Sequence, residues 1–213
     1  MTMTGTLHLV AVGDDVEQAR AVARSLAGTA FVDERAEAQG LPFRAMVVAV
    51  TDDPETFLLA AGTGAYIACR RIIKARRAGE SAAGSGALTA ATRLPGVIGL
   101  FPMVRHSALS HRDADRHWRD VHAPLALEHH AAMSHYTQLS VVHRLHGPEW
   151  DGFALCGFDS MEDLRERFFA TPEGRIAIRE DVARFADTRS SPRRLIVVEE
   201  RYRSPPIASS TSW

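Results

Sequence analysis

The stretch Ser110–Tyr136, SHRDADRHWRDVHAPLALEHHAAMSHY, is the segment from which we interpret the fold of the whole chain. Nine of the ten histidines lie between His106 and His146, and this stretch carries the spacing of an amphipathic helix. Ser110 is suited to begin the helix, because its hydroxyl can accept from a free backbone N–H of the first turn. Trp118, Val121 and His122 then fall on one apolar face, which predicts a histidine packed beside a tryptophan.

Pro124 is expected to end this helix. The residue before a proline is disfavoured in the helical region, so Ala123 should be extended and His122 should be the last helical residue. The free carbonyls at a helix end favour a protonated imidazole, which suits His122 to act as a general acid or base. The alternative is a packed histidine whose ring satisfies a backbone carbonyl. Pro124 would also start a second short helix, Leu125 to Met133.

The neighbouring histidines give weaker signals. His117, His129 and His130 flank charged or small residues, so we expect them at the surface. A metal site is disfavoured, because the spacing shows no H-E-x-x-H and no histidine pair four residues apart on one continuous helix. Zinc needs three or four converging ligands.

The composition is that of a soluble globular protein: 213 residues, 46% apolar and 24% charged. The net charge of −1 argues against a nucleic acid or a membrane surface as the main partner. The basic run from Arg70 to Arg77 is interpreted as a solvated strand end, with an anion or nucleic-acid patch as the alternative.

The two cysteines and the N-terminus bear on the compartment. Cys69 and Cys156 each lie inside an apolar run, which is typical of buried thiols in a reducing environment. The first residues lack a basic segment and soon meet acidic residues, unlike a signal peptide. No apolar run is long enough to span a bilayer. We therefore expect a cytoplasmic protein.

The remaining chain shows one pattern twice. In the first half we expect strands at 6–12, 31–34 and 43–50 and helices at 16–28 and after Asp53, while 66–73 fits either a strand or a helix. In the second half we expect strands at 97–106, 135–145, 152–158 and 193–202, with helices at 160–169 and from 172 through Phe185. The predicted boundaries are a first unit at 1–78, a linker at 79–94, a second unit at 95–203 and a tail at 204–213.

This pattern predicts an α+β fold. Each half would form a four-stranded antiparallel sheet with two helices on one face. The other face of each sheet would be an exposed apolar surface, so two such sheets should pack face to face, from one chain or from two. The natural pocket lies between a sheet and its helices or between the sheets.

From Pro95 to Tyr202 the sequence resembles the EthD family of dimeric α/β-barrel proteins. The matching residues are Ser110, the segment Trp118–Leu125 (WRDVHAPL), Tyr136, Asp151–Phe153 (DGF), Phe158–Ser160 (FDS), Pro172–Gly174 (PEG), Asp181 and Phe185. The W-x-x-x-H-A-P-L core is the most specific part. The N-terminal half does not match and would be a degenerate second copy.

The resemblance implies two tandem ferredoxin-like βαββαβ units in a dimeric-α/β-barrel-like arrangement, with a pocket for small aromatic or polyketide-like molecules. The wider superfamily includes cofactor-free monooxygenases, isomerases, cyclases, dehydratases and decarboxylases, and distant members that bind haem. One fold hosts many reactions, so the fold alone does not choose among them. The motif lacks an obvious flavin or nicotinamide site, which favours side-chain chemistry without a cofactor.

Our leading functional hypothesis is acid/base chemistry on a carbonyl-bearing small molecule, by a dehydratase, isomerase, cyclase or decarboxylase. His122 would be the acid or base, and Tyr136 or His143 would donate to the substrate carbonyl. Trp118 would form the apolar wall of the substrate site. The further substrate-binding candidates are Phe101, Arg105 and His106.

Three alternatives remain open. The first is a cofactor-free oxygenase, in which a histidine removes a phenolic proton and the substrate carbanion reacts with oxygen. The second is a small-molecule-binding accessory protein, and the third is haem binding through His122 or His130. Asp181 and Arg184 on the last helix are expected to be an ordinary exposed pair. The partners expected are a small molecule and, in one arrangement, a second copy of the chain.

Overall fold

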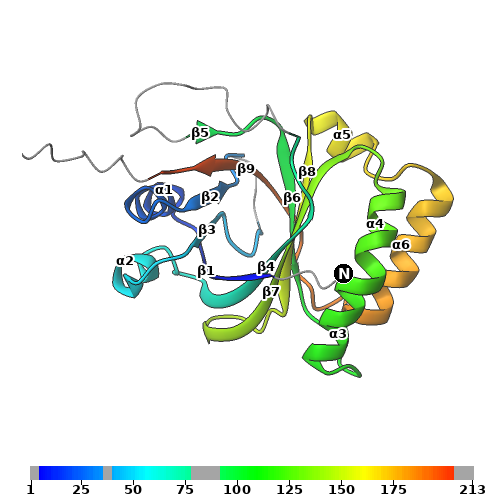
Figure 1. Cartoon of the computed structure of the whole chain (residues 1–213), viewed down its shortest axis with the longest axis horizontal. Helices are drawn as coiled ribbons and strands as arrows, with labels where there is room; N and C mark the ends of the chain where they lie inside the picture. The colour runs from blue at the N-terminus through cyan, green and yellow to red at the C-terminus, as the bar shows by residue number, and fades with distance from the viewer. Residues whose placement is uncertain (1–4, 36–39, 78–91, 204–213) are drawn as a thin grey trace, which may run out of the picture.

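The computed structural model describes residues 5–35, 40–77 and 92–203. Its elements run β-α-β-β-α-β twice (Figure 1). The first half contains β1 (Thr6–Gly13), α1 (Val16–Ser25), β2 (Thr29–Val32), β3 (Ala45–Ala49), α2 (Pro54–Leu58) and β4 (Gly64–Lys74). The second half contains the short β5 (Thr92–Arg93), β6 (Val97–Met103), α3 (His111–His117), the π-helical turn η1 (Trp118–His122), α4 (Ala123–His129), β7 (Met133–His146), β8 (Gly152–Phe158), α5 (Met161–Glu166), α6 (Pro172–Phe185) and β9 (Leu195–Arg201).

Eight of the strands close into one antiparallel barrel. The order is β2-β3-β1-β4-β7-β8-β6-β9, and β2 also pairs with β9 to complete the circle. Within each half the strands follow the same order, second, third, first, fourth. The two halves are hydrogen-bonded edge to edge by β4 with β7 and by β2 with β9, so the barrel closes within one chain.

Each half's sheet was expected to have one face without helices, and these two faces meet inside the barrel. Residues 66–73, whose sequence fitted either a strand or a helix, form part of strand β4. They are a strand because they pair with both β1 and β7. Residues 79–91 of the predicted linker and the predicted tail lie outside the described residues.

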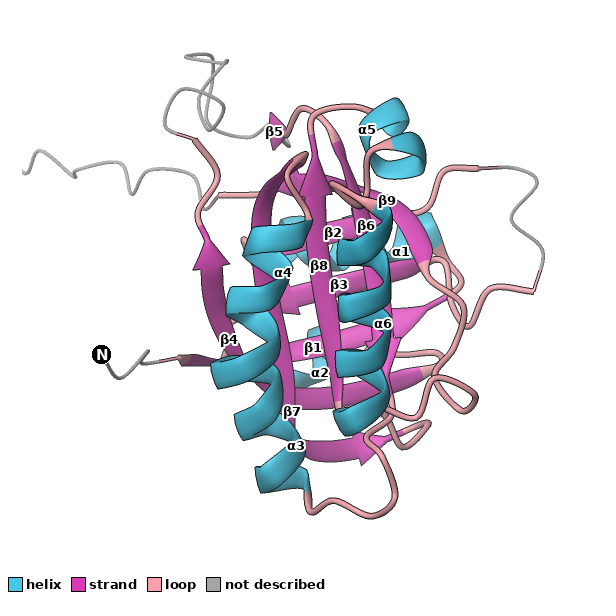
Figure 2. Cartoon of the chain, turned by 90° about the vertical axis from the view of Figure 1, so that its right-hand side faces the viewer, coloured by secondary structure: helices cyan, strands magenta, loops and turns pink. Residues whose placement is uncertain are grey.

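The helices cover the outside of the barrel. Figure 1 shows α1 and α2 on one side and α3, α4 and α6 on the other, and Figure 2 shows the latter group in front of β7 and β8. Side chains begin the helices as expected: the hydroxyls of Ser110 and Ser160 accept from the backbone N–H of Asp113 and Asp163, and Thr171 caps α6. The candidate site therefore lies between one helix layer and the outer face of the second half's sheet.

The barrel interior is filled by apolar side chains. Aromatic rings cluster at one end. There the ring centroid of Phe153 lies 5.5–6.4 Å from those of Phe43, Tyr66 and Trp150. Strand residues that point inward farther along include Leu139, in the same cluster. The space between the sheets is thus a packed core at this end rather than a pocket.

Candidate functional site

The helix that begins at Ser110 does not end at His122. Residues 111–129 form one continuous helix in which Ala123 keeps helical dihedral angles, φ −61° and ψ −46°, so the predicted break before Pro124 is wrong. The physical reason is the π-helical turn Trp118–His122, where the N–H of Ala123 bonds the carbonyl of Trp118, five residues back. A wider turn relieves the clash that a proline ring otherwise makes with the preceding turn.

The π turn also changes which residues face inward. Trp118, His122, Ala123 and Ala126 are buried, whereas Val121 is 48% exposed, contrary to its predicted place on the apolar face. A π turn adds a residue to the helical period, so the side chains after it rotate relative to an α-helix. His122 is buried as predicted, but through this turn and not through a helix end.

A buried carboxylate holds the His122 ring. The Asp181 Oδ2 atom accepts from His122 Nδ1 at 2.9 Å, and Oδ1 accepts from His117 Nε2 at 2.8 Å. An ionised carboxylate only accepts, so both rings donate, which leaves the His122 lone pair on Nε2. Burial alone would raise the pKa of Asp181, but the hydrogen bonds from His122 and His117 hold it below its ordinary value.

The expectation of an ordinary exposed pair at Asp181 is therefore wrong, since this residue is 3% exposed and bridges two histidines. His117, expected at the surface, is partly covered and stacks on Phe185 with ring centroids 5.2 Å apart. The His122 Nε2 atom has no hydrogen-bond partner among the described residues, and it keeps slight contact with solvent in a residue that is 8% exposed.

Trp118 and Tyr136 are joined directly. The Trp118 indole N–H donates to the Tyr136 hydroxyl at 3.0 Å, and Gln138 Nε2 donates to the same hydroxyl at 3.1 Å. Gln138 Nε2 also donates to the Trp118 carbonyl, which fixes the orientation of its amide. Tyr136 is 1% exposed, and burial raises its pKa far above the ordinary value. Its own O–H proton has no acceptor among the described residues, so it is free to donate.

An arginine extends this network. Arg71 donates through Nη1 to Gln138 Oε1 at 3.5 Å and through Nη2 to both oxygens of Asp115 at 2.7 Å. Gly152 leaves the space that Trp118 fills, because a Cβ at that glycine would lie 2.6 Å from the indole. We call Trp118, His122, Tyr136 and Asp181 the helix-layer site.

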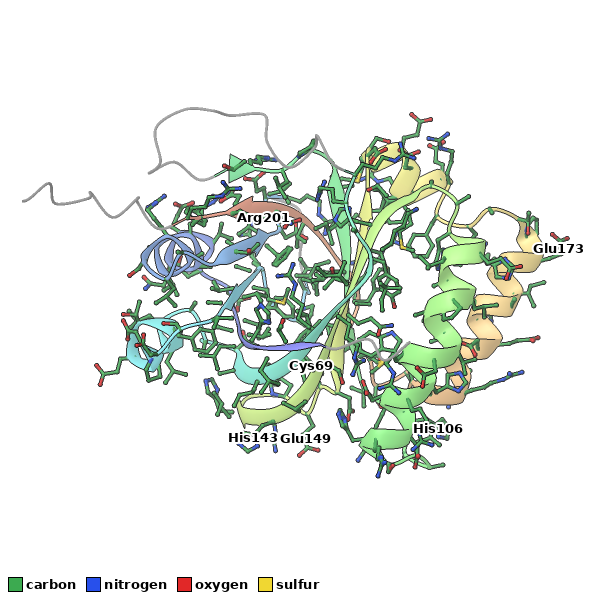
Figure 3. All side chains as sticks on the ribbon, viewed as in Figure 1. Cys69, His106, His143, Glu149, Glu173 and Arg201 are labelled. Atoms are coloured by element: carbon green, nitrogen blue, oxygen red, sulfur yellow. The ribbon has the colours of Figure 1, made fainter. Side chains whose placement is uncertain are left out.

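The other predicted site residues lie apart from it. His143 is exposed on β7, opposite Ile67, and lies at the lower left of the molecule in Figure 3. His106 is exposed below α3, where its ring accepts from the N–H of Ala108. Arg105 lies 3.5 Å from Asp151, and Phe101 packs on Phe168 with centroids 5.9 Å apart. The structure joins Trp118 to Tyr136 by a hydrogen bond and places His122 one helical turn from Trp118, whereas these four residues lie apart from them.

His130 is buried rather than at the surface. It is 4% exposed, and its Nδ1 lies 2.7 Å from the carbonyl of Phe168. Burial lowers its pKa to about 4, with a smaller opposite effect of the Phe168 carbonyl. This is the arrangement that we considered as the alternative for His122, a ring satisfied by the backbone. Within the described ranges, no three histidine, cysteine, aspartate or glutamate side chains are grouped to hold a metal ion.

We predicted that the basic run at 70–77 is a solvated strand end, but part of it is buried. Arg71 is buried in the network just described, and the Arg76 side chain is 7% exposed. Cys156 is buried as predicted, whereas Cys69 is only partly covered; both thiols are free. Pairing of β4 with β7 covers the run, which a local pattern of charge does not foresee.

A cavity of about 590 Å³ opens at the end of the helix layer near α5. Its lining includes Lys74, Ser134 and Asp159 but neither His122 nor Trp118. No helix in the described part of the chain has the length and apolar character needed to cross a membrane.

Sequence reasoning missed one member of the helix-layer site, Asp181 as the partner of His122, and two residues of the network that adjoins it, Gln138 and Arg71. A signal for Asp181 existed, because it is among the residues that carry the family resemblance and lies on an inward-facing helix position beside Ile178. Gln138 is a polar residue in an otherwise buried strand, which is itself a signal of a required hydrogen bond.

The EthD domain, as a family model, matches residues 106–189. This range runs from the start of the histidine-rich helix through α6, so the predicted resemblance is confirmed there. No curated protein matches the chain in sequence.

Two crystal structures are similar to this chain. One is a candidate monooxygenase from Lactobacillus acidophilus NCFM, with 10% identity, a TM-score of 0.46 and coverage of 92% of this chain and 93% of that one. The other is an anthrone oxidase-like protein, with 11% identity, a TM-score of 0.51 and coverage of 96% of this chain and 95% of that one. The second likeness shows a shared fold.

The name of the anthrone oxidase-like protein describes oxidation. It contradicts the prediction of a dehydratase, isomerase, cyclase or decarboxylase, and it is closer to the alternative of an oxygenase, which needs the same side chains.

Proposed function

We propose that this protein is a cofactor-independent oxygenase that acts on a small, electron-rich aromatic molecule. Its fold would be two tandem ferredoxin-like units closed into one dimeric-α/β-barrel-like body. The observation that carries the proposal is the His122–Asp181 pair, 2.9 Å apart, in the same sheet-to-helix layer as the buried Tyr136 hydroxyl. The oxidative name of the anthrone oxidase-like protein supports the reaction type.

In this proposal His122 is the base. Asp181 accepts the Nδ1 proton, so the ring is held with the Nε2 lone pair available, and the carboxylate stabilises the imidazolium formed when Nε2 takes a proton. His117 shares the same carboxylate and limits its movement. A positioned base of this kind contributes about 10²–10⁴-fold to a rate.

Trp118 and Tyr136 would orient the substrate. The indole gives a flat apolar wall, and the Tyr136 hydroxyl already accepts two hydrogen bonds, which leaves its proton for a substrate oxygen. Charge that develops on that oxygen after proton removal is stabilised by such a donor. Tyr136 thereby favours the enolate or phenolate form of the substrate.

The reaction balances without an external reductant. A methylene between aromatic rings and activated by a carbonyl loses a proton to His122, and the carbanion adds O₂ to give a peroxide. Loss of water from the peroxide leaves a ketone, so one oxygen atom enters the product and the other leaves as water. The methylene carbon supplies all four electrons that reduce O₂.

The test uses anthrone as the probe. We expect the purified protein to consume one O₂ per anthraquinone formed, and ¹⁸O₂ to place one labelled atom in the product. His122→Ala should lower kcat by about 10²-fold or more without a matching fall in melting temperature. His146→Ala is the matched control, since this histidine is exposed on the far hairpin.

Two outcomes would reject the proposal. Oxygen uptake that survives His122→Ala unchanged would remove the base from the mechanism. Saturable binding of anthrone and related polycyclic phenols with no O₂ uptake would instead identify a binding protein. Trp118→Phe separates the two roles, because it should raise KM for an oxygenase and raise Kd alone for a binding protein.

A further inference from the structure

A second group of charged residues lies inside the barrel, on the face of the sheet away from the helix-layer site. Successive side chains of a strand point to opposite faces of the sheet, so every second residue after an inward-facing core residue also points into the barrel. On β9 the core residues Leu195 and Val197 are followed by Glu199 and Arg201, and on β4 Tyr66 and Ala68 are followed by Arg70. On β7, His135 lies two residues before the inward-facing position 137, so it also points into the barrel. We call Arg70, Arg76, His135, Glu199 and Arg201 the barrel-mouth cluster.

Contacts tie the cluster together. Arg76 donates through Nη2 to Glu199 at 3.0 Å and to the Nε2 atom of His135 at 3.1 Å, and Arg201 donates to the other Glu199 oxygen at 2.7 Å. The third link of Arg76 is to the carbonyl of Pro95. Figure 3 places Arg201 at the opposite end of the barrel from His143.

His135 is held neutral by this geometry. A guanidinium only donates, so the His135 Nε2 atom accepts, and its proton is on Nδ1, 3.1 Å from the Ser134 hydroxyl. Burial, and then Arg76, lowers the His135 pKa to about 4. The ring occupies space that only a glycine leaves, because a Cβ at Gly157 would lie 1.7 Å from it.

The charges of the cluster do not balance. Three guanidinium groups face one carboxylate, Glu199, whose two oxygens already serve Arg76 and Arg201. Arg70 makes no side-chain hydrogen bond with the described residues, and burial and then Arg201 lower its pKa. Besides Glu199, the acid that acts on the His135 pKa is Asp159, which is exposed. Unpaired positive charge in a poorly solvated place is costly, so it is kept where it has a use.

One polar atom of the cluster has no partner among the residues that the structure describes. The Arg76 side chain is 7% exposed, and its buried Nε meets no acceptor there. A buried N–H without an acceptor is uncommon, and an oxygen ligand would satisfy it. A guanidinium presents parallel donors that match the two oxygens of a carboxylate.

We infer that the barrel-mouth cluster binds a small organic carboxylate, whose oxygens lie against Arg70 and Arg76. The site is separate from the helix-layer site, because His135 points into the barrel whereas Tyr136 and Gln138 point to the helices. The cavity of about 590 Å³ adjoins the cluster through Ser134, which lines it and contacts His135. That cavity is lined by three basic and three acidic side chains, so the positive charge that recognises an anion comes from the cluster itself.

The test is a titration of the full-length protein with benzoate, with inorganic phosphate in a second arm and chloride at equal ionic strength as the reference. We expect calorimetry to show saturable 1:1 binding of benzoate and a rise in melting temperature that chloride does not give. Tighter binding of phosphate than of benzoate would overturn the assignment to a carboxylate. Absence of saturable binding in both arms would overturn the site.

Variants locate the binding. Arg70→Gln should weaken benzoate binding by about tenfold or more, because it removes a charged donor from the ligand. In the chloride reference buffer, without benzoate or phosphate, the same variant should melt at or above the wild-type temperature, since it removes a positive charge that has no partner among the described residues. Arg144→Gln, on the far hairpin, is the matched control and should bind like the wild type. Equal affinity of the two variants would mean nonspecific attraction and overturn the site.

Arg76→Gln is a second variant, with a risk to folding because Arg76 pairs with Glu199. These measurements need no turnover, so their outcome is independent of whether the oxygenase proposal survives.

Discussion

His122 and His135 are both buried, yet their surroundings have opposite charge. His122 shares the carboxylate of Asp181 with His117, so a negative charge lies against its ring. His135 accepts from Arg76, and burial, followed by Arg76, lowers its pKa to about 4. The two rings therefore differ because distant parts of the chain place an acid beside one and an arginine beside the other.

The two faces of the same sheet carry charges that suit different chemistry. The helix-layer site pairs a histidine with an acid, which suits proton removal. The barrel-mouth cluster pairs a histidine with arginines, which suits attraction of an anion. One strand, β7, carries His135 on the inner face and Tyr136 on the outer face, and alternation of side chains separates the two sites by a single residue step.

The largest effect should be the dependence of stability on pH. Burial lowers the pKa of both His130 and His135 from 6.5 to about 4, so between these values the unfolded chain binds protons that the folded chain does not. Stability is therefore full above pH 6.5 and is lost as the pH falls towards 4, by about 3 kcal/mol for each ring. Urea unfolding between pH 7 and 4.5 measures this slope.

His135→Gln should remove about half of that slope, while His146→Gln, at an exposed position, should leave it unchanged. Asp181 acts in the same direction at lower pH, because its depressed pKa stabilises the folded protein above the ordinary value and this stability is lost on acidification. Benzoate should flatten the slope further, since a bound negative charge offsets Arg76 beside His135. An unchanged slope in His135→Gln would show that the ring titrates freely.

The second prediction concerns the space that His135 occupies. Gly157→Ala places a methyl group 1.7 Å from the ring, so we expect a loss of about 2–3 kcal/mol in the free energy of unfolding. Combining it with His135→Ala should recover much of this loss, because the two changes concern one contact. Gly62→Ala is the control, since a Cβ there meets nothing within 4 Å. Additive losses in the double variant would place the strain elsewhere.

Much of the fold follows from local pattern. Strand β8 lies at 152–158 as predicted, and Ser110, Ser160 and Thr171 begin helices because their hydroxyls satisfy free backbone N–H groups. Binary pattern also gave the repeated element order. These features depend on residues a few positions apart, which is the range over which sequence spacing is informative.

The site follows much less from pattern. Pro124 predicts a break only if the preceding turn is α-helical, and the π turn is a tertiary accommodation that packing of Trp118 against β8 stabilises. Asp181 reaches His122 from 59 residues away, and Glu199 reaches Arg76 from 123 residues away. The basic run is buried because β4 pairs with β7, which is a contact between distant segments. The charge pattern of the run by itself therefore indicated a strand end that faces solvent.

The third prediction tests the helix-layer site. Tyr136→Phe removes the oxygen that accepts from Trp118 Nε1 and Gln138 Nε2 and leaves the indole donor buried without a partner. We expect a loss of about 1–2 kcal/mol in stability, because Gln138 keeps its bond to the Trp118 carbonyl while the indole does not recover. Chemical denaturation measures it, with Tyr202→Phe, at the other side of the barrel, as the matched removal of a hydroxyl. A loss in stability with full O₂ uptake would make Tyr136 structural alone.

The smallest effect distinguishes the two helical registers around His122. Val121 is 48% exposed because the π turn carries it out of the apolar face, so Val121→Gln should change the free energy of unfolding by less than about 0.5 kcal/mol. Ala126→Gln, at a buried position of the same helix, should cost about 1–3 kcal/mol by overpacking. If Val121→Gln proves as costly as Ala126→Gln, the helix is regular at this turn and a different face meets the sheet. His122 would then lose its contact with Asp181, and the contrast with His135 would lose its physical basis.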